Sequence, residues 1–135
     1  MTELRVSADS HLSERPDLWE KGLPAQYRDR APRFPRIQLG RGNHVRAGGW
    51  DPVARLKDMA ADGISAEVLY PTLAKSIYEQ CEDVEVAEAS CRVYNDWQLE
   101  YCQEAPDRLW GQAFIGLWNI DHAIAELQRA RKEGK

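Results

Sequence analysis

The chain has 135 residues, of which 43% are hydrophobic and 30% charged, and it carries a formal net charge of −4. This length is sufficient for one hydrophobic core, and the composition is that of a folded globular protein rather than a disordered one. The basic residues are scattered and there is no long apolar run or signal-peptide pattern, so we expect a cytoplasmic protein that binds neither nucleic acid nor a membrane.

The first predicted element is a short strand, because residues 4–9 alternate between apolar and polar side chains. An insertion rich in proline and glycine follows, from about residue 14 to residue 50. Within it we expect only a short helix at Asp17–Lys21 and an isolated strand at Arg36–Leu39. Long connections of this kind are uncommon and often form active-site loops.

A helix is predicted from Pro52 to about Asp62. Asp51 is suited to cap its start, and Gly63 is suited to end it in the left-handed conformation. Residues 66–70 form a near-continuous apolar run that predicts a buried strand closed by Pro71. On the helix surface, Arg55 and Asp58 are spaced to form an ordinary ion pair.

The second half of the chain predicts one more strand between two helices. The first helix begins after Asp83 and runs to about Glu104 or Ala105, where Pro106 stops it. The strand is expected at Leu109 to Leu117, and Asn119 then caps a helix that ends at Gly134.

The order of these elements indicates an α/β fold with a parallel sheet covered by helices. Three parallel strands leave apolar surface uncovered, and a closed (β/α)₈ barrel takes about 250 residues. We therefore expect a partial (β/α)₈ TIM barrel: residues 1–135 supply its first three βα units, with the insertion after strand 1. The alternative is a complete, small, open domain of flavodoxin-like type, but no glycine-rich phosphate loop follows the first strand.

The three cysteines, Cys81, Cys91 and Cys102, form no CxxC pair. An odd number without this spacing argues against a disulfide framework and against a structural zinc site. We expect reduced, half-buried helix residues.

Asp9 and His11 form the main candidate site. In an extended strand, residues two apart project to the same side, about 6.6 Å apart, so both side chains can converge on one ion. A carboxylate and an imidazole together suit zinc or manganese. The alternative is two polar residues where a strand runs out into a loop, and two ligands alone would leave the site incomplete.

Further candidates lie near the ends of the first two strands, where barrel enzymes place functional groups. Glu14 is predicted either to contact substrate or to tie down local backbone. Tyr70 and Thr72 are predicted either to bind substrate or to form a structural turn. His44 is predicted either to be a solvated loop histidine or to reach over the site from the insertion, and His122 is expected to point to solvent.

Four segments of the chain resemble the amidohydrolase-related proteins: DSHLSERPDLWEKGLPAQYRDRAPR, GGWDPVARLKDMAADGISAEVLYPT, YNDWQLEYCQEAPDRLWGQAFIGL and AIAELQRARKEG. This family contains metal-dependent hydrolases and nonoxidative decarboxylases. The resemblance implies a distorted (β/α)₈ barrel with a divalent metal, usually zinc and sometimes manganese. It also implies that Asp9 and His11 are metal ligands, and that the family's further histidines and aspartate lie on later strands.

The resulting hypothesis is the N-terminal part of a metal-dependent amidohydrolase-superfamily enzyme acting on a small carboxylate-bearing substrate, by hydrolysis or by decarboxylation. No catalytic acid or base is assigned within the chain, and we expect the chain alone to be inactive. The alternative is a noncatalytic part-barrel that covers its open strands by assembling with a partner or as a homo-oligomer.

Overall fold

The computed structural model describes residues 3–15, 17–34 and 46–134. The predicted strand at Arg36–Leu39 and the histidine at position 44 lie outside these residues. Among the residues that the structure describes, no helix is both long and apolar enough to cross a lipid bilayer.

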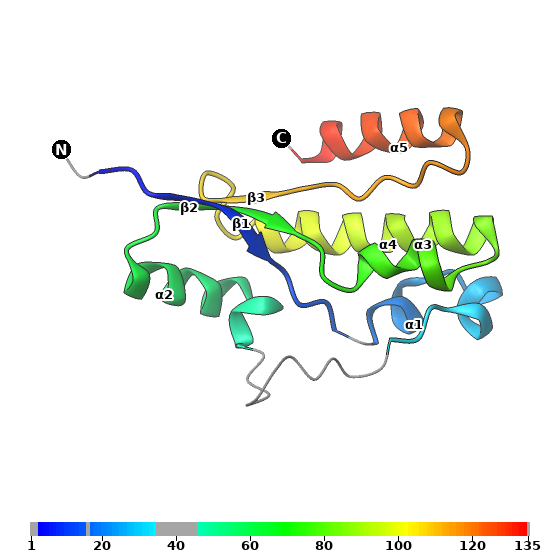
Figure 1. The fold of residues 1–135 in the computed structure, drawn as a ribbon, viewed down its shortest axis with the longest axis horizontal. Coiled ribbons are helices and arrows are strands. Elements are labelled where there is room, and N and C mark those ends of the chain that lie inside the picture. The colour runs from blue at the N-terminus through cyan, green and yellow to red at the C-terminus, as the bar shows by residue number, and fades with distance from the viewer. Residues whose placement is uncertain (1–2, 16, 35–45, 135) are drawn as a thin grey trace.

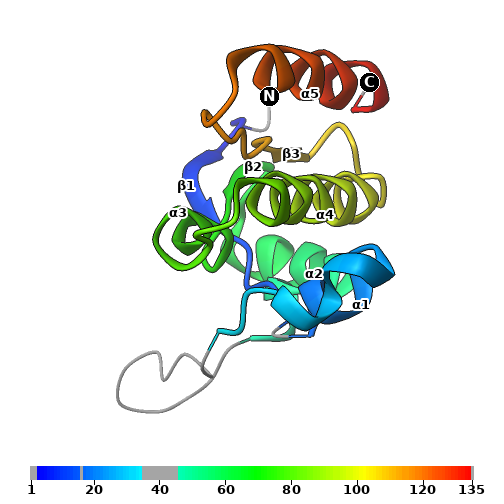
Figure 2. The same ribbon diagram turned by 90° about the vertical axis from the view of Figure 1, so that its right-hand side faces the viewer.

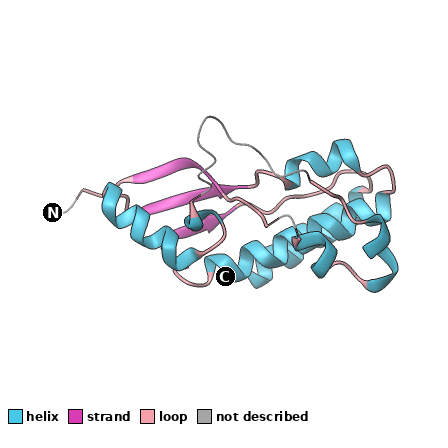
Figure 3. Ribbon diagram, turned by 90° about the horizontal axis from the view of Figure 1, so that it is seen from below, coloured by secondary structure: helices cyan, strands magenta, loops and turns pink. Residues whose placement is uncertain are grey.

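Three parallel strands form one sheet in the order β1-β2-β3: β1 (Val6–His11), β2 (Ala66–Tyr70) and β3 (Leu109–Gly111) (Figure 1). Figure 3 shows them side by side. Each strand lies beside its neighbour in sequence, as in the successive βα units of a barrel, whereas a flavodoxin-like sheet places its first strand between the second and third. The fold is therefore α/β and consistent with part of a TIM barrel.

Three long helices follow the three strands: α2 (Pro52–Asp62), α4 (Val84–Cys102) and α5 (Ile120–Glu133). Figure 2 shows them stacked in chain order, with α4 in the middle. The described part of the chain also contains shorter pieces: α1 (Leu18–Gly22), α3 (Ile77–Gln80) and the 3₁₀ turns η1 (Ala25–Arg30), η2 (Ala47–Gly49) and η3 (Ala74–Ser76).

Side-chain caps begin the three long helices where the sequence predicts them. The carboxylates of Asp51 and Asp83 and the amide oxygen of Asn119 each accept two backbone N–H groups from the first turn. Gly63 ends α2 with a φ of 69°, a left-handed conformation that glycine adopts without a steric penalty. Local capping chemistry therefore accounts for the accuracy of these boundaries.

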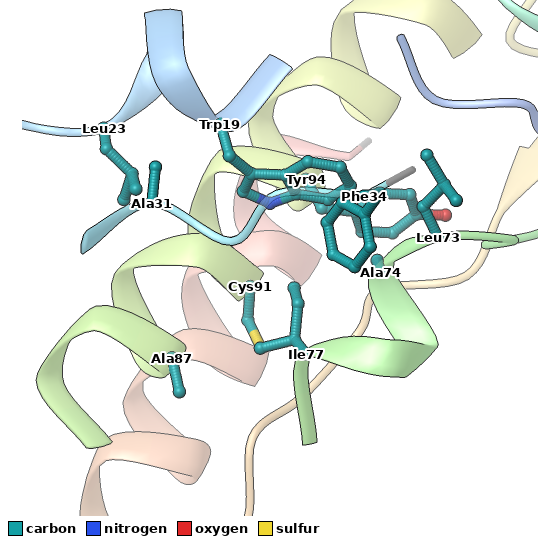
Figure 4. Packing of buried hydrophobic residues seen from close by; sticks show 10 residues of the cluster. All are labelled: Trp19, Leu23, Ala31, Phe34, Leu73, Ala74, Ile77, Ala87, Cys91 and Tyr94. Atoms are coloured by element: carbon teal, nitrogen blue, oxygen red, sulfur yellow. The ribbon is translucent and has the colours of Figure 1, made fainter. Parts of the chain in front are cut away.

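The first core cluster packs the insertion against α4 (Figure 4). Trp19 of α1 is fully buried, its ring lies 4.6 Å from that of Phe34, and its indole N–H donates to the backbone oxygen of Ser90 at 3.0 Å. The predicted insertion is thus an integral part of the domain.

The second core cluster lies between the sheet and the helices α2 and α4, and it consists of Leu12, Met59, Leu69, Tyr101 and Leu109. Leu69 of β2 is fully buried in this cluster. Leu117, by contrast, is mostly exposed.

Two strand boundaries differ from the sequence prediction. β1 runs from residue 6 to residue 11 rather than from 4 to 9, because pairing with β2 continues to the His11–Tyr70 register pair. β3 ends at Gly111 rather than at Leu117, because its pairing with β2 ends where β2 ends. Beyond Gly111, the side-chain amide of Asn95 accepts the backbone N–H of Phe114 and donates to its backbone oxygen, in place of a neighbouring strand.

Candidate metal centre

Asp9 and His11 lie at the carboxyl end of β1, which is the same edge of the sheet as the end of β2. The register of the two strands is irregular here: Ser7 pairs with Glu67 and Ser10 pairs with Leu69, so β1 has one extra residue between these pairs. A bulge of this kind bends a strand and redirects its side chains, and bulges are frequent beside active sites.

The structure brings Asp9 and His11 together. The Nε2 atom of His11 lies 3.6 Å from Oδ1 of Asp9, and both side chains are open to solvent, with exposed fractions of 47% for His11 and 90% for Asp9. In a tetrahedral zinc site with bonds of about 2.0–2.2 Å, neighbouring ligand atoms are about 3.4 Å apart. The observed separation therefore suits two ligands of one metal ion.

His11 contacts the segment that follows β2. Its Nδ1 atom lies 3.1 Å from the backbone oxygen of Pro71 and 3.4 Å from the hydroxyl of Thr72. That hydroxyl also donates to the backbone oxygen of Leu12 at 2.6 Å. The ring of Tyr70 lies 6.1 Å from the imidazole, and Tyr70 is partly exposed. Tyr70 and Thr72, the two predicted substrate-binding residues at the end of β2 and just after it, therefore lie beside the candidate metal ligands.

Glu14 is buried, with only 4% of the residue exposed. Its two carboxylate oxygens accept the backbone N–H groups of Thr72, Leu73 and Ala74 at 2.9–3.2 Å. Burial raises the pKa of this carboxyl above its usual 4.5, and the backbone N–H groups oppose that rise. Glu14 therefore ties down local backbone, which was one of the two predicted roles. Its contact with substrate stays a prediction.

A largely buried ion pair lies between α2 and β2 and also contacts the end of β1. The guanidinium of Arg55 on α2 donates to Glu67 of β2 at 2.5 Å and to the backbone oxygen of His11 at 3.1 Å. The prediction of a surface ion pair between Arg55 and Asp58 is wrong. The guanidinium of Arg55 binds Glu67 of β2 instead, because the Glu67 side chain points toward α2. The signal available in the sequence was the acidic residue at position 67 inside an apolar strand.

Other polar candidates lie elsewhere. His122 is mostly exposed in the first turn of α5, with Nδ1 2.8 Å from Glu88. Cys81, Cys91 and Cys102 are free thiols on or beside helices, and burial raises the pKa of Cys91 to about 12. Neither the histidine nor these thiols join the candidate centre.

The candidate centre is a half-site. Within residues 3–15, 17–34 and 46–134, no group of three or more histidine, cysteine, aspartate or glutamate side chains is arranged to hold a metal ion. A catalytic zinc site normally uses three protein ligands and a water. The carboxylate and imidazole of β1 fit a metal, but they do not complete its coordination.

A comparison with known families places the chain in one of them. A family model described as "Amidohydrolase" matches residues 8–135. The chain belongs to this amidohydrolase family. No curated protein matches the chain in a sequence search.

Solved structures of amidohydrolases and decarboxylases share the fold. An amidohydrolase from Mycobacterium avium subsp. paratuberculosis superimposes with a TM-score of 0.78 at 17% identity, over 99% of this chain and 48% of that one. A 2,6-dihydroxybenzoate decarboxylase from Rhizobium gives 0.62 at 25% identity, over 98% and 36%. A dihydroxybenzoic acid decarboxylase from Polaromonas with bound manganese and the inhibitor 2-nitroresorcinol gives 0.60 at 21%, over 97% and 36%. The 135-residue chain therefore spans less than half the length of each of these three solved proteins.

Proposed function

We propose that this amidohydrolase chain contributes part of the active site of a metal-dependent enzyme, and that Asp9 and His11 are two ligands of its divalent metal. The observation that carries the proposal is the 3.6 Å separation of their ligand atoms at the carboxyl end of β1. An imidazole and a carboxylate favour zinc, and manganese is the second choice. The manganese bound in the Polaromonas decarboxylase supports the choice of a divalent ion.

The proposed reaction is hydrolysis or nonoxidative decarboxylation of a small carboxylate-bearing substrate. A bound divalent metal supplies Lewis-acid polarisation of a substrate oxygen or a water of lowered pKa. In this proposal Tyr70 and Thr72 contact the substrate, because both lie at the same sheet edge as the ligand pair. The similarity to two dihydroxybenzoate decarboxylases favours decarboxylation, and we propose a cytoplasmic location.

Titration with Mn²⁺ tests the metal ligands without requiring tight binding. A paramagnetic ion held by Asp9 and His11 broadens the amide signals of β1, Tyr70 and Thr72 first in two-dimensional NMR spectra. We expect His11→Asn and Asp9→Asn to abolish this local broadening. His122→Asn is the matched control, because His122 is an exposed histidine beside a carboxylate on α5. Broadening centred on α5, or unchanged in the two β1 variants, would contradict the proposal.

A second candidate function is a noncatalytic assembly module. The observation that favours it is the apolar face of α5, where Ile120, Ile124 and Leu127 are exposed although their spacing predicts a buried stripe. Size-exclusion chromatography with light scattering, in the presence and absence of EDTA, separates the candidates. A discrete dimer that needs no metal would favour assembly of two copies through this face.

A further inference from the structure

The carboxylate of Glu14 anchors the loop that follows β2. Glu14 accepts three consecutive backbone N–H groups, from residues 72 to 74, and no other side chain in the described part of the chain accepts them. Three hydrogen bonds to one buried carboxyl group fix three successive residues, so the position of this loop depends strongly on Glu14. Glu14 itself lies three residues after His11, on the chain that leaves β1.

The same loop determines the environment of the His11 imidazole. The backbone oxygen of Pro71 can only accept a hydrogen bond, so the Nδ1 atom 3.1 Å away must carry the proton. The Thr72 hydroxyl, which donates its own hydrogen to Leu12, can accept a second, longer bond from the same N–H. A neutral imidazole protonated at Nδ1 presents its lone pair at Nε2, and Nε2 is the atom that faces Asp9.

We propose that Glu14 is a positioning residue for His11: by fixing the loop at residues 71–74, it holds the Pro71 carbonyl against Nδ1 and keeps Nε2 free to bind the metal. The proposal rests on the proposed metal function of His11. Metal-binding histidines characteristically donate their second ring N–H to a carbonyl or carboxylate, and losing this partner costs about 10- to 100-fold in metal affinity. Here the hydrogen-bond partner is a main-chain oxygen, so the residue that controls it is the one that anchors the loop.

The tautomer of His11 provides a direct test, because it can be measured without metal. In protein labelled with ¹⁵N-histidine at a pH where the imidazole is neutral, long-range ¹H–¹⁵N spectra distinguish the two ring nitrogens, and His11→Asn assigns the signal. We expect the Nδ1–H form in the wild-type chain. A wild-type His11 that is mainly in the Nε2–H form would overturn the proposal before any variant is made.

Variants at position 14 then test the dependence on the loop anchor. Glu14→Gln places an NH₂ group against backbone donors, so we expect a shift toward a mixture of tautomers and a rise of about 10- to 100-fold in the dissociation constant for Zn²⁺. Glu14→Asp keeps the charge and is expected to restore part of the Nδ1–H population. Glu79→Gln is the matched control, since Glu79 is exposed on α3, close in sequence to the loop.

The outcomes separate the two proposals. Unchanged tautomer and Zn²⁺ affinity in Glu14→Gln, with Zn²⁺ still bound at His11, would overturn the positioning role and leave the metal assignment in place. The expected tautomer shift in a chain that never binds Zn²⁺ at His11 would support the structural link and overturn the metal assignment. Dispersed amide signals from α5 in each variant verify that the domain is folded.

Discussion

Nε2 of His11 lies 3.6 Å from Oδ1 of Asp9, so the imidazole and the carboxylate leave β1 on the same side. In the proposed function a divalent metal binds at this edge of the sheet, and the two side chains would supply part of its coordination. They cannot supply all of it, because the described residues contain no third histidine, cysteine or acidic side chain that joins them.

The first prediction concerns activity. With only two metal ligands from β1, we expect the 135-residue chain to release no CO₂ from 2,6-dihydroxybenzoate, with Zn²⁺ or Mn²⁺ added, above the rate of the metal buffer alone. Carbon dioxide release measured at millimolar substrate is the assay. Turnover that EDTA removes, and that the His11→Asn variant lacks, would show that the chain is sufficient for catalysis.

The second prediction concerns the ion pair between Arg55 of α2 and Glu67 of β2. The side chains of Arg55 and Glu67 are only 13% and 11% exposed, so replacing Arg55 with Met leaves a carboxylate buried without its partner. Breaking a buried pair in this way costs about 3–5 kcal/mol. Urea unfolding measures the loss of stability. For the control we choose Arg46→Met, because Arg46 is mostly exposed and lies 3.8 Å from the partly exposed Asp58, and we expect a loss of less than about 1 kcal/mol.

A smaller cost for Arg55→Met, equal to that of Arg46→Met, would mean that water reaches Glu67 in solution. The double variant Arg55→Met with Glu67→Leu removes both charges at once. It should recover much of the lost stability, because an apolar pair of similar volume avoids the desolvation penalty of the ions.

The sequence is sufficient to predict most of the helices and the order of the strands. Asp51, Asp83 and Asn119 determine the helix starts through contacts within one turn, and such local signals are visible in a linear sequence. The Asp9–His11 relationship was also predictable, because it depends on the two-residue period of a strand.

Long-range contacts account for what the sequence could not predict. The Pro71 carbonyl beside His11 and the Glu14 anchor depend on residues about 60 positions apart in the chain. The insertion was expected to be mostly irregular, yet Trp19 is buried in a core shared with α4. Asn95 on α4 is fully buried and hydrogen-bonded to Phe114, a contact that the helical spacing of α4 does not reveal.

The third prediction concerns Asn95. Its amide accepts the backbone N–H of Phe114 at 2.7 Å and donates to the Phe114 oxygen at 3.1 Å and to Glu126 at 2.9 Å. Asn95→Ala leaves these partly buried groups without a partner, so we expect a loss of about 2–3 kcal/mol in the free energy of unfolding. Asn119→Ala, which removes only the cap of α5, should cost about 1 kcal/mol. Equal losses would indicate that water replaces the Asn95 amide.

The fourth prediction concerns the acid stability of the α4–α5 contact. Partial burial raises the pKa of Glu126, but hydrogen bonds from Arg129 and Asn95, together with the positive charges of Arg129 and Arg92, outweigh burial and hold it below its usual 4.5. A carboxyl whose folded pKa is lowered contributes stability above its unfolded pKa and loses that contribution as the pH falls through the folded value.

Glu126→Gln removes this titration while keeping a side chain of similar size. We expect the stability difference between the wild type and Glu126→Gln to be constant at pH 5–7 and to shrink progressively below about pH 4.5, as measured by urea unfolding at each pH. Glu100→Gln on the exposed face of α4 controls for the loss of one negative charge. A difference that stays constant down to pH 3, or one that grows there, would show that Glu126 does not gain its stabilisation from the ionised form bound to Arg129.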